Sequence, residues 1–306
     1  MSNQYLDCFK KESNIFRLIG ISSKTKNSDD NIFFFKSYED LFQSNEIDAV
    51  YISTLNNTHK NFVKEAFKYK KKILCEKPLG MNLDEVKELY DLFQSNKNDL
   101  IEAIAYRSHP QTFYILDLLK DNEIGEVKKI ESNFGFKVKK IRKDSRLFNK
   151  ELGGGSILDL GCYPISFFNL FTKDKKIEVT QSKFNVCETN VDIDGEISLK
   201  INHNIDAVGK VSLRENLKNI CRIHTEKALI TVMDPWLPSY KTYIEVETKS
   251  RYYKKIISSD KNVYDHHLEQ NSKFFLNKSS DTNLLVNIDE SFEISKILDI
   301  WKNNKR

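Results

Sequence analysis

The sequence has few of the features that mark membrane, secreted or metal-binding proteins. None of its apolar runs approaches the roughly 20 residues that a helix needs to cross a bilayer, and the N-terminus lacks the apolar core of a signal peptide. The five cysteines are odd in number, and no two have the spacing of metal ligands. We therefore expect reduced thiols and a cytoplasmic location, with no membrane and no metal site.

An excess of charge of one sign is also missing. The 48 Lys and Arg residues nearly balance the 44 Asp and Glu residues, which leaves a net charge of +4. The densest basic stretch, residues 137–143, is interrupted by Val138 and Ile141. This distribution argues against a nucleic-acid partner. The length of 306 residues and the hydrophobic content of 40% allow one large domain or two of ordinary size.

Glycine is scarce at the start of the chain. The first of the ten glycines is Gly20, and no set of them spells G-x-G-x-x-G. That motif forms the turn that holds the phosphates in dinucleotide-binding folds. The sequence therefore contains no phosphate-binding turn of this kind.

The first part of the chain alternates between strand-like and helix-like segments. Asn82, with Glu85 three residues later, indicates the start of the clearest helix. The expected strands are residues 16–22, 48–53, 73–75 and 100–105, and the expected helices are residues 38–43, 59–70, 82–97 and 111–120. This alternation predicts a Rossmann-like, doubly wound parallel sheet in a first domain of residues 1–122.

After about residue 125 the pattern changes to long strands with few helices between them. The expected strands are residues 127–138, 177–187, 193–201, 207–214, 220–224, 228–232 and 243–248, and the expected helices are residues 156–171, 266–275 and 289–302. This pattern predicts an α+β domain with a large, mostly antiparallel sheet in residues 123–306.

Polar side chains follow the expected strands of the first domain. Ligands of open parallel sheets bind beyond the carboxyl ends of the strands. The side chains there are, in chain order, Ser22, Lys24, Thr54, Asn56, Glu76, Lys77 and Arg107. We expect these groups to converge on one edge of the sheet.

Glu76-Lys77-Pro78 is the first motif with a chemical meaning. A lysine at the end of a parallel strand can hydrogen-bond a substrate oxygen and stabilise charge that develops on it. A surface turn with a solvated Glu–Lys pair is the alternative, and these three residues alone favour it.

A glycine triplet at residues 153–155 precedes a helix that carries Asp159 and Tyr163. The two side chains are four residues apart, so we expect them to share one helix face. A carboxylate and a phenol on one face can orient a substrate and transfer a proton. A hinge with Tyr163 in the core and Asp159 near a helix N-terminus is an equally good interpretation.

Other polar residues give weaker signals. Arg107 can bind a phosphate or a carboxylate, whereas His109, which precedes Pro110, is typical of a helix start. The adjacent His266 and His267 are interpreted as surface residues, and Trp236 as a packing residue.

Four segments in order resemble the Gfo/Idh/MocA oxidoreductase family: residues 54–59, 75–79, 106–110 and 153–164. Tyr163 and residues 234–236 are similar to the branch that contains dimeric dihydrodiol dehydrogenase and D-xylose dehydrogenase. The resemblance covers nearly the whole chain and implies a nucleotide-binding domain followed by a domain for substrate binding and oligomer formation. It also implies a homodimer or higher homo-oligomer.

The resemblance further implies hydride transfer between NADP or NAD and a sugar, polyol or diol. Lys77 would hold the reacting oxygen, Tyr163 would donate or accept the proton, and Asp159 would orient the substrate. Ser22 and Lys24, with no acidic residue beside them, would suit the 2′-phosphate of NADP. The residues implied to line the cofactor cleft are Thr54, Asn56, His59, Glu76 and Arg107.

The sequence departs from this family at its start, where the family has a first strand and a glycine-rich turn. Three explanations are open: a translation start further upstream, a gene fragment, or a protein that works without a dinucleotide. Because the downstream chemical residues are all present, we favour the first two. The alternative function is a non-enzymatic sugar-binding or oligomer-forming homologue.

Overall fold

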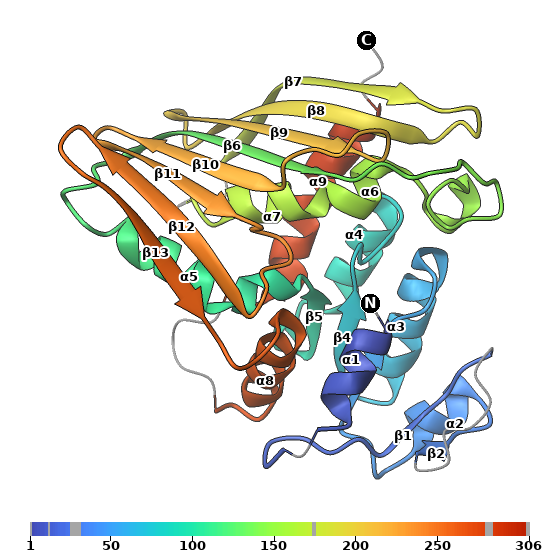
Figure 1. Cartoon of the computed structure of the whole chain (residues 1–306). Coiled ribbons are helices and arrows are strands. Elements are labelled where there is room, and N and C mark those ends of the chain that lie inside the picture. The colour runs from blue at the N-terminus through green and yellow to red at the C-terminus, as the bar shows by residue number, and fades with distance from the viewer. Residues whose placement is uncertain (1, 12, 25–31, 173–175, 279–283, 304–306) are drawn as a thin grey trace.

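The computed structural model describes residues 2–11, 13–24, 32–172, 176–278 and 284–303. In these ranges the strands form a two-stranded sheet in the order β1-β2, a four-stranded sheet in the order β14-β5-β4-β3, and an eight-stranded sheet in the order β13-β12-β11-β10-β6-β9-β8-β7. Figure 1 shows the large sheet above the helices and the smaller sheets below them. The expected fold class, a Rossmann-like region followed by a large mostly antiparallel sheet, is confirmed.

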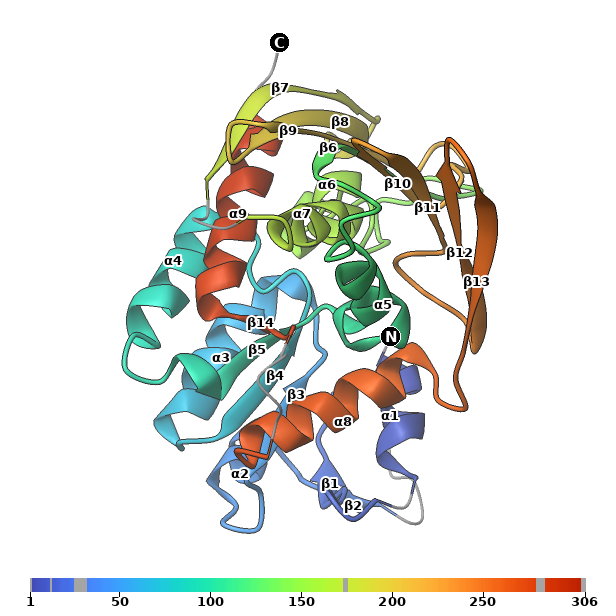
Figure 2. The ribbon, with the colours of Figure 1, turned by 90° about the vertical axis from the view of Figure 1, so that its left-hand side faces the viewer.

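The four-stranded sheet is built around strands that run in parallel and are buried. β3 (Ala49–Ile52) pairs with β4 (Lys72–Glu76), and β4 pairs with β5 (Leu100–Ala103). Every residue of β5 is buried, as expected for a parallel strand covered on both faces. Figure 2 shows α3 and α4 on one side of this sheet and α8 on the other. The elements that accompany these strands are α1 (Ser2–Phe9), α2 (Tyr38–Gln43), η1 (Asn56–Thr58), α3 (His59–Lys68), α4 (Leu83–Leu92), η2 (Lys97–Asp99), η3 (Ala105–Ser108) and α5 (Pro110–Leu118).

The expected strand at residues 16–22 is mostly wrong. Only β1 (Gly20–Ile21) forms a ladder, and its partner is the equally short β2 (Phe33–Phe34). A strand extends only as far as a neighbouring strand pairs with it. β2 offers two residues for pairing, so β1 is also two residues long. Phe16 instead packs its ring against Phe9 of α1.

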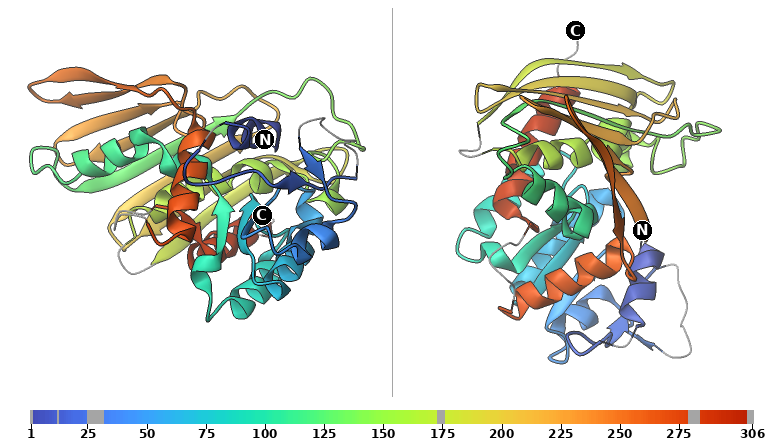
Figure 3. Two further views of the ribbon diagram at one scale, coloured as in Figure 1. Left: turned by 90° about the horizontal axis from the view of Figure 1, so that it is seen from below. Right: turned by 60° about the vertical axis from the view of Figure 1, so that its left-hand side comes forward.

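The eight-stranded sheet is antiparallel except for the parallel pair β6–β9. Its strands are β6 (Val127–Gly135), β7 (Ile177–Val186), β8 (Asp192–Ile201), β9 (Ile205–Ser212), β10 (Ile220–Thr225), β11 (Ala228–Met233), β12 (Lys241–Thr248) and β13 (Tyr252–Ser258). Sequence reasoning missed β13, because this edge strand is largely exposed and contains two adjacent lysines. Figure 3 shows the sheet as a curved layer above helices that include α6, α7 and α9.

The helix expected at residues 156–171 is divided into α6 (Ser156–Leu160) and α7 (Cys162–Asn169). Gly161 between them keeps right-handed helical backbone angles, and its amide bonds the carbonyl of Ile157. The spacing of Asp159 and Tyr163 therefore remains close to that of one helix.

The last segment of the chain returns to the first sheet. It consists of α8 (Val263–Phe275), β14 (Val286–Asn287) and α9 (Ile288–Asn303). β14 pairs antiparallel with β5, and α9 packs against both α4 and α7. The C-terminal segment thus adds a strand to the sheet of the first expected domain. The expected domain boundary between residues 122 and 123 stays a prediction.

The interpretation of His267 as a surface residue is wrong. Its side chain is fully buried, and Nδ1 lies within hydrogen-bond distance of the Tyr5 hydroxyl. α8 packs against α1, which is distant in the sequence, so no local pattern could reveal this contact. In the part of the chain that the structure describes, no helix is long and apolar enough to span a membrane.

Trp301 should stabilise the packing of α9 against the α6–α7 junction and the large sheet. Its ring is fully buried and lies over Gly161 and Gly195, where an added Cβ would approach it to 3.2 and 3.0 Å. We expect Trp301→Ala to lower the free energy of unfolding by about 3–5 kcal/mol, because it leaves a large cavity.

Urea denaturation would measure this loss. Ile300→Ala is the matched control, since the neighbouring side chain is 42% exposed and should change the free energy of unfolding by less than about 1 kcal/mol. Equal effects of the two substitutions would contradict the docking of α9 described above.

Candidate active site

Three groups from distant parts of the chain gather at the carboxyl end of β4. The Lys77 ammonium donates hydrogen bonds to the backbone carbonyl of Asp159 at 2.6 Å and to its Oδ1 at 3.3 Å. The same ammonium lies 5.0 Å from the centre of the Tyr163 ring. All three residues are buried. The structure therefore brings together the ammonium, the carboxylate and the phenol of the sequence prediction.

Mutual attraction keeps Lys77 and Asp159 ionised although both are buried. Burial is the largest single effect on the pKa of the Lys77 ammonium and would lower it, but Asp159 and other acidic groups nearby together raise that pKa above its ordinary value. Burial would likewise raise the pKa of the Asp159 carboxyl, and the charges of Lys77 and Arg146 bring it below its ordinary value. Removing either partner would leave the other as an unpaired buried charge, which is strongly destabilising.

Tyr163 is held as a neutral phenol. Burial raises the pKa of its hydroxyl, although the nearby Lys77 ammonium acts in the opposite direction. Its ring lies in an aromatic cluster, with centroids 5.1 Å from Phe134, 6.2 Å from Trp236 and 6.3 Å from Tyr106. Trp236 is itself buried and donates its Nε1–H to the Asn133 carbonyl, in keeping with the packing role expected for it.

Arg146 is a member of the site that sequence reasoning missed. Its Nη1 donates to Asp159 Oδ1 at 2.9 Å, and its side chain is about half exposed. The residue lies between β6 and α6 in a segment with no helical or strand periodicity. No signal in the sequence pointed to it, because only the folded segment places it against Asp159.

Glu76 and His59 are also buried at this edge. The Tyr51 hydroxyl donates to Glu76 Oε1, which partly offsets the burial that raises the pKa of the Glu76 carboxyl. His59 links two strand ends, since Nδ1 lies 2.9 Å from the Pro78 carbonyl and Nε2 lies 3.1 Å from the Thr54 carbonyl. His59 thus fixes the turns that follow β3 and β4.

Thr54 and Asn56 lie on the turn that follows β3. The Thr54 hydroxyl is 2.7 Å from the hydroxyl of Thr58. The Asn56 amide donates to the Gly153 carbonyl at 3.4 Å. Asn56 therefore connects this turn to the glycine triplet that precedes α6.

Arg107 uses its guanidinium for internal partners. It donates to the carbonyls of Leu284 and Ser166, and it forms a bidentate pair with Glu290 in which both distances are 2.7 Å. These bonds connect η3 with α7 and α9. The structure thus places Arg107 in contact with the C-terminal segment and does not bring its guanidinium to Lys77.

Ser22 and Lys24 directly follow β1, in the separate two-stranded sheet. Ser22 is half-buried, and Lys24 is exposed. They are therefore on a different sheet from Glu76 and Lys77. Within the described residues, no group of three or more His, Cys, Asp or Glu side chains could hold a metal ion.

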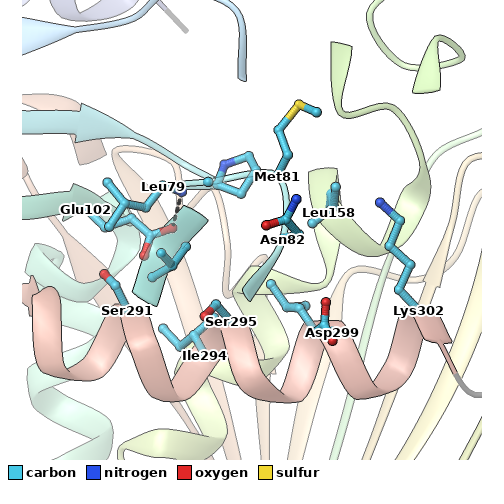
Figure 4. A pocket seen from close by; sticks show the side chains of 14 residues that line it. Leu79, Met81, Asn82, Glu102, Leu158, Ser291, Ile294, Ser295, Asp299 and Lys302 are labelled. Carbon is cyan, nitrogen blue, oxygen red and sulfur yellow. Dashed lines mark hydrogen bonds between the residues drawn. The ribbon is translucent and has the colours of Figure 1, made fainter. Parts of the chain in front are cut away.

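A small pocket lies behind the turn that carries Lys77. Figure 4 shows Ser291 of α9 beside Glu102 of β5, and Lys302 at the other end of the helix, near Leu158. The Leu79 amide donates to Glu102 Oε1 at 3.1 Å. Burial raises the pKa of the Glu102 carboxyl to about 7. A titratable group thus supports the backbone directly next to the Lys77-Pro78 turn.

Two stretches of the chain match known protein-family domains. Residues 3–103 match the oxidoreductase family with an NAD-binding Rossmann fold, and residues 114–231 match the GFO/IDH/MocA C-terminal domain. The chain belongs to the Gfo/Idh/MocA oxidoreductase family. The two matches occur in the order in which the structure places the parallel and the antiparallel sheets.

Curated members of the family include similar proteins. A trans-1,2-dihydrobenzene-1,2-diol dehydrogenase of Xenopus tropicalis is 34% identical over 216 residues, which cover 70% of this chain and 64% of that protein. A D-xylose 1-dehydrogenase (NADP(+)) of Haloferax volcanii is 38% identical over 135 residues, which cover 44% of this chain and 41% of that protein. The aligned part is therefore less than two thirds of these relatives. Both belong to the branch that Tyr163 and residues 234–236 indicated.

Solved structures of Gfo/Idh/MocA oxidoreductases share the fold. A 3-ketoreductase from Actinomadura kijaniata, solved with NADP and TDP-benzene, superposes with a TM-score of 0.77 at 18% identity, covering 87% of this chain and 81% of that one. An aldose-aldose oxidoreductase from Caulobacter crescentus, solved with glycerol, has a TM-score of 0.76 at 18% identity, covering 88% and 80%. At this identity the likeness shows the architecture alone.

The donor set at the strand ends fits the nicotinamide half of a dinucleotide. Glu76 offers a carboxylate at the last residue of β4, and Thr54 and Asn56 offer a hydroxyl and an amide directly after β3. Hydroxyl, amide and carboxylate groups are those that bind ribose and carboxamide groups. Among the residues described, no glycine-rich turn faces the same edge, so the fit does not extend to the pyrophosphate.

Glu102 should make stability depend on pH. The unfolded carboxyl loses its proton near its ordinary pKa of 4.5, whereas the folded one keeps it up to about 7. Between these values the unfolded chain releases a proton that the folded chain retains, so the contribution of Glu102 to stability falls as pH rises. The loss is complete above about pH 7 and should reach roughly 3 kcal/mol at most.

Glu102→Gln keeps an acceptor for the Leu79 amide but cannot ionise. We expect its gain in free energy of unfolding, relative to the unmodified protein, to be larger at pH 8 than at pH 5. Urea titrations at both pH values would measure the difference, with the exposed Glu46→Gln as control. A gain that does not change with pH would show that Glu102 does not titrate in this range.

Proposed function

We propose that the protein is an NAD(P)-dependent oxidoreductase that transfers a hydride between nicotinamide and a carbinol or carbonyl carbon of a sugar, polyol or diol. The observation that carries this proposal is the contact of the Lys77 ammonium with Asp159, beside the Tyr163 ring. Relatives named as dehydrogenases of a diol and of D-xylose support the substrate class.

Lys77 and Asp159 would position the reacting oxygen. A nicotinamide held there would supply or accept the hydride at the substrate carbon. When the carbonyl is reduced, negative charge develops on its oxygen, and a fixed ammonium stabilises that charge without reorganising. Asp159 holds the ammonium in place through two acceptors, its carbonyl and its Oδ1. The pair therefore acts as a pre-oriented electrostatic clamp.

Tyr163 would supply the proton in the same direction of reaction. Burial keeps its phenol protonated at neutral pH, which suits a donor to the oxygen that becomes a hydroxyl. In the oxidative direction the phenol would first release its own proton to solvent, and the resulting phenolate would then accept the proton of the substrate hydroxyl. The ammonium of Lys77 nearby makes that release easier, because it lowers the pKa of the phenol.

Glu76, Thr54 and Asn56 would hold the nicotinamide half of the cofactor, and His59 would support them by fixing the turns after β3 and β4. For Ser22 and Lys24 we propose contact with a 2′-phosphate, so that NADP is preferred over NAD. For Arg107 we propose a structural role in place of cofactor binding, because Glu290, Ser166 and Leu284 already accept its hydrogen bonds.

We also infer that the protein works in the cytoplasm as a homodimer or larger homo-oligomer. The described cysteines are free thiols, which suits a reducing compartment. The edge strand β13 exposes Tyr252 and Ile256, which offers apolar area for a second copy. Light scattering on the purified chain measures the number of subunits.

Removing the Tyr163 hydroxyl should slow turnover strongly. We expect Tyr163→Phe to reduce kcat by roughly 10²- to 10⁴-fold, the usual range for loss of an acid–base group. The assay follows nicotinamide absorbance with NADP and a panel that includes D-xylose and a trans-diol.

Tyr106→Phe is the matched control, because its hydroxyl contacts Ser166 within the same aromatic cluster. It should leave kcat within a few-fold. A Tyr163→Phe protein as fast as the Tyr106→Phe protein would exclude the assigned role of the phenol.

Reversing the charge of Lys24 should change cofactor preference. We expect Lys24→Glu to weaken NADPH binding by about tenfold, because it replaces attraction to the 2′-phosphate with repulsion, and to leave NADH binding nearly unchanged. Titration of nicotinamide fluorescence measures both affinities. Lys128→Glu, on the exposed surface of β6, is the control, and equal losses for NADPH and NADH would argue against the assignment.

A further inference from the structure

α6 has a helix start that its own sequence does not cap. The residue before it is Gly155, which has no side chain to accept from the first turn. The acceptor comes instead from Asp192, the first residue of β8 in the large sheet. Asp192 Oδ2 accepts from the Ile157 amide at 2.6 Å and from the Ser156 hydroxyl at 2.9 Å. A buried carboxylate from another element thus performs the task that an N-cap residue usually performs.

The third glycine of the triplet is required by this contact. Gly155 has a φ of +119°, and a Cβ added to it would lie 2.3 Å from Asp192 Oδ1. Both the backbone angle and the close approach exclude other residues. The glycine that sequence reasoning interpreted as permitting a close approach therefore makes room for Asp192.

α6 also provides both acceptors of the Lys77 ammonium. These are the carbonyl and the Oδ1 of Asp159, two residues after the amide that Asp192 binds. A helix of five residues is far too short to be stable by itself, so its position depends on its anchors. Movement of its first turn would displace Asp159 from Lys77.

We propose that Asp192 is a positioning residue for the reaction proposed above: by capping α6 from β8, it holds Asp159 against the Lys77 ammonium. The inference rests on the proposed function for its catalytic meaning. Its physical content, that Asp192 keeps Lys77 paired, can be tested without any cofactor or substrate.

Acetylation of lysine side chains, read by mass spectrometry on the full chain, tests this content. Only an unprotonated and accessible amine reacts, so a paired and buried Lys77 is acetylated slowly. In Asp192→Ala we expect Lys77 to react roughly five- to tenfold faster, in line with the loss of an N-cap interaction. Lys71 is an internal reference, because its side chain is buried and its ammonium bonds the carbonyls of Ser44 and Ile47, which are remote from α6.

Asp194→Ala is the matched control. Asp194 lies two residues further along β8, is also buried, and bonds Asn185 and Arg214. It makes no bond to α6 among the interactions described here, so Lys77 should react as in the unmodified protein. If Lys77 and Lys71 accelerate together in Asp192→Ala, the substitution acts on global stability, and the proposal is overturned. An unchanged rate at Lys77 overturns it as well.

Asp192→Asn keeps an acceptor for the Ile157 amide and is the variant to use if Asp192→Ala does not fold. We expect a selective increase at Lys77 of about twofold over Lys71, smaller than for alanine, and none in Asp194→Asn. No selective increase in Asp192→Asn would refute the proposal. In the NADP-linked assay, the Asp192 variants should lower kcat and leave the affinity for NADPH unchanged, whereas the Asp194 variants should change neither.

The two proposals can fail separately. A chain that shows the selective change at Lys77 but reduces no substrate would retain the role of Asp192 and lose the proposed activity. A chain that is active but shows no selective change would retain the activity and lose the role of Asp192.

Discussion

The ion pair between Lys77 and Asp159 is the interaction on which the site depends. An ammonium buried without a partner would lose its proton or destabilise the fold, since burial alone lowers its pKa. Asp159 prevents this with a carbonyl at 2.6 Å and a carboxylate oxygen at 3.3 Å. Because Lys77 directly follows β4 and Asp159 lies in α6, the pair also joins the parallel sheet to the helices under the large sheet. The same contact therefore keeps the Lys77 ammonium charged and holds the two regions together.

Several other contacts join the same two regions, and each involves a charged or polar group. Asn56 bonds the carbonyl of Gly153, and Arg107 bonds Glu290 of α9. Asp192 in turn fixes α6 to the large sheet. Polar contacts of this kind need defined geometry, whereas apolar contacts tolerate sliding. The arrangement therefore suits a site whose chemistry requires fixed positions of an ammonium, a carboxylate and a phenol.

Much of the architecture was predictable because its signals are local. α2 and α3 begin where the sequence predicted, and Asn82 caps α4 as expected. The segments in which prediction failed have weak local signals. The strand at β1 is shortened for lack of a partner, and the exposed edge strand β13 alternates poorly. His267 looked like a surface residue only because α1, which covers it, lies far away in the sequence.

By itself the sequence pointed to Lys77, Asp159 and Tyr163 as candidate site residues, since short motifs with fixed spacing are readable without coordinates. Only the tertiary structure decided that Arg146 and Asp192 support them and that Arg107 is bound to Glu290. Arg107 and Glu290 are 183 positions apart, and Asp192 and Ile157 are 35 apart. Periodicity in a sequence describes neighbours within one helix or strand, whereas these pairs form only after separate elements have packed together.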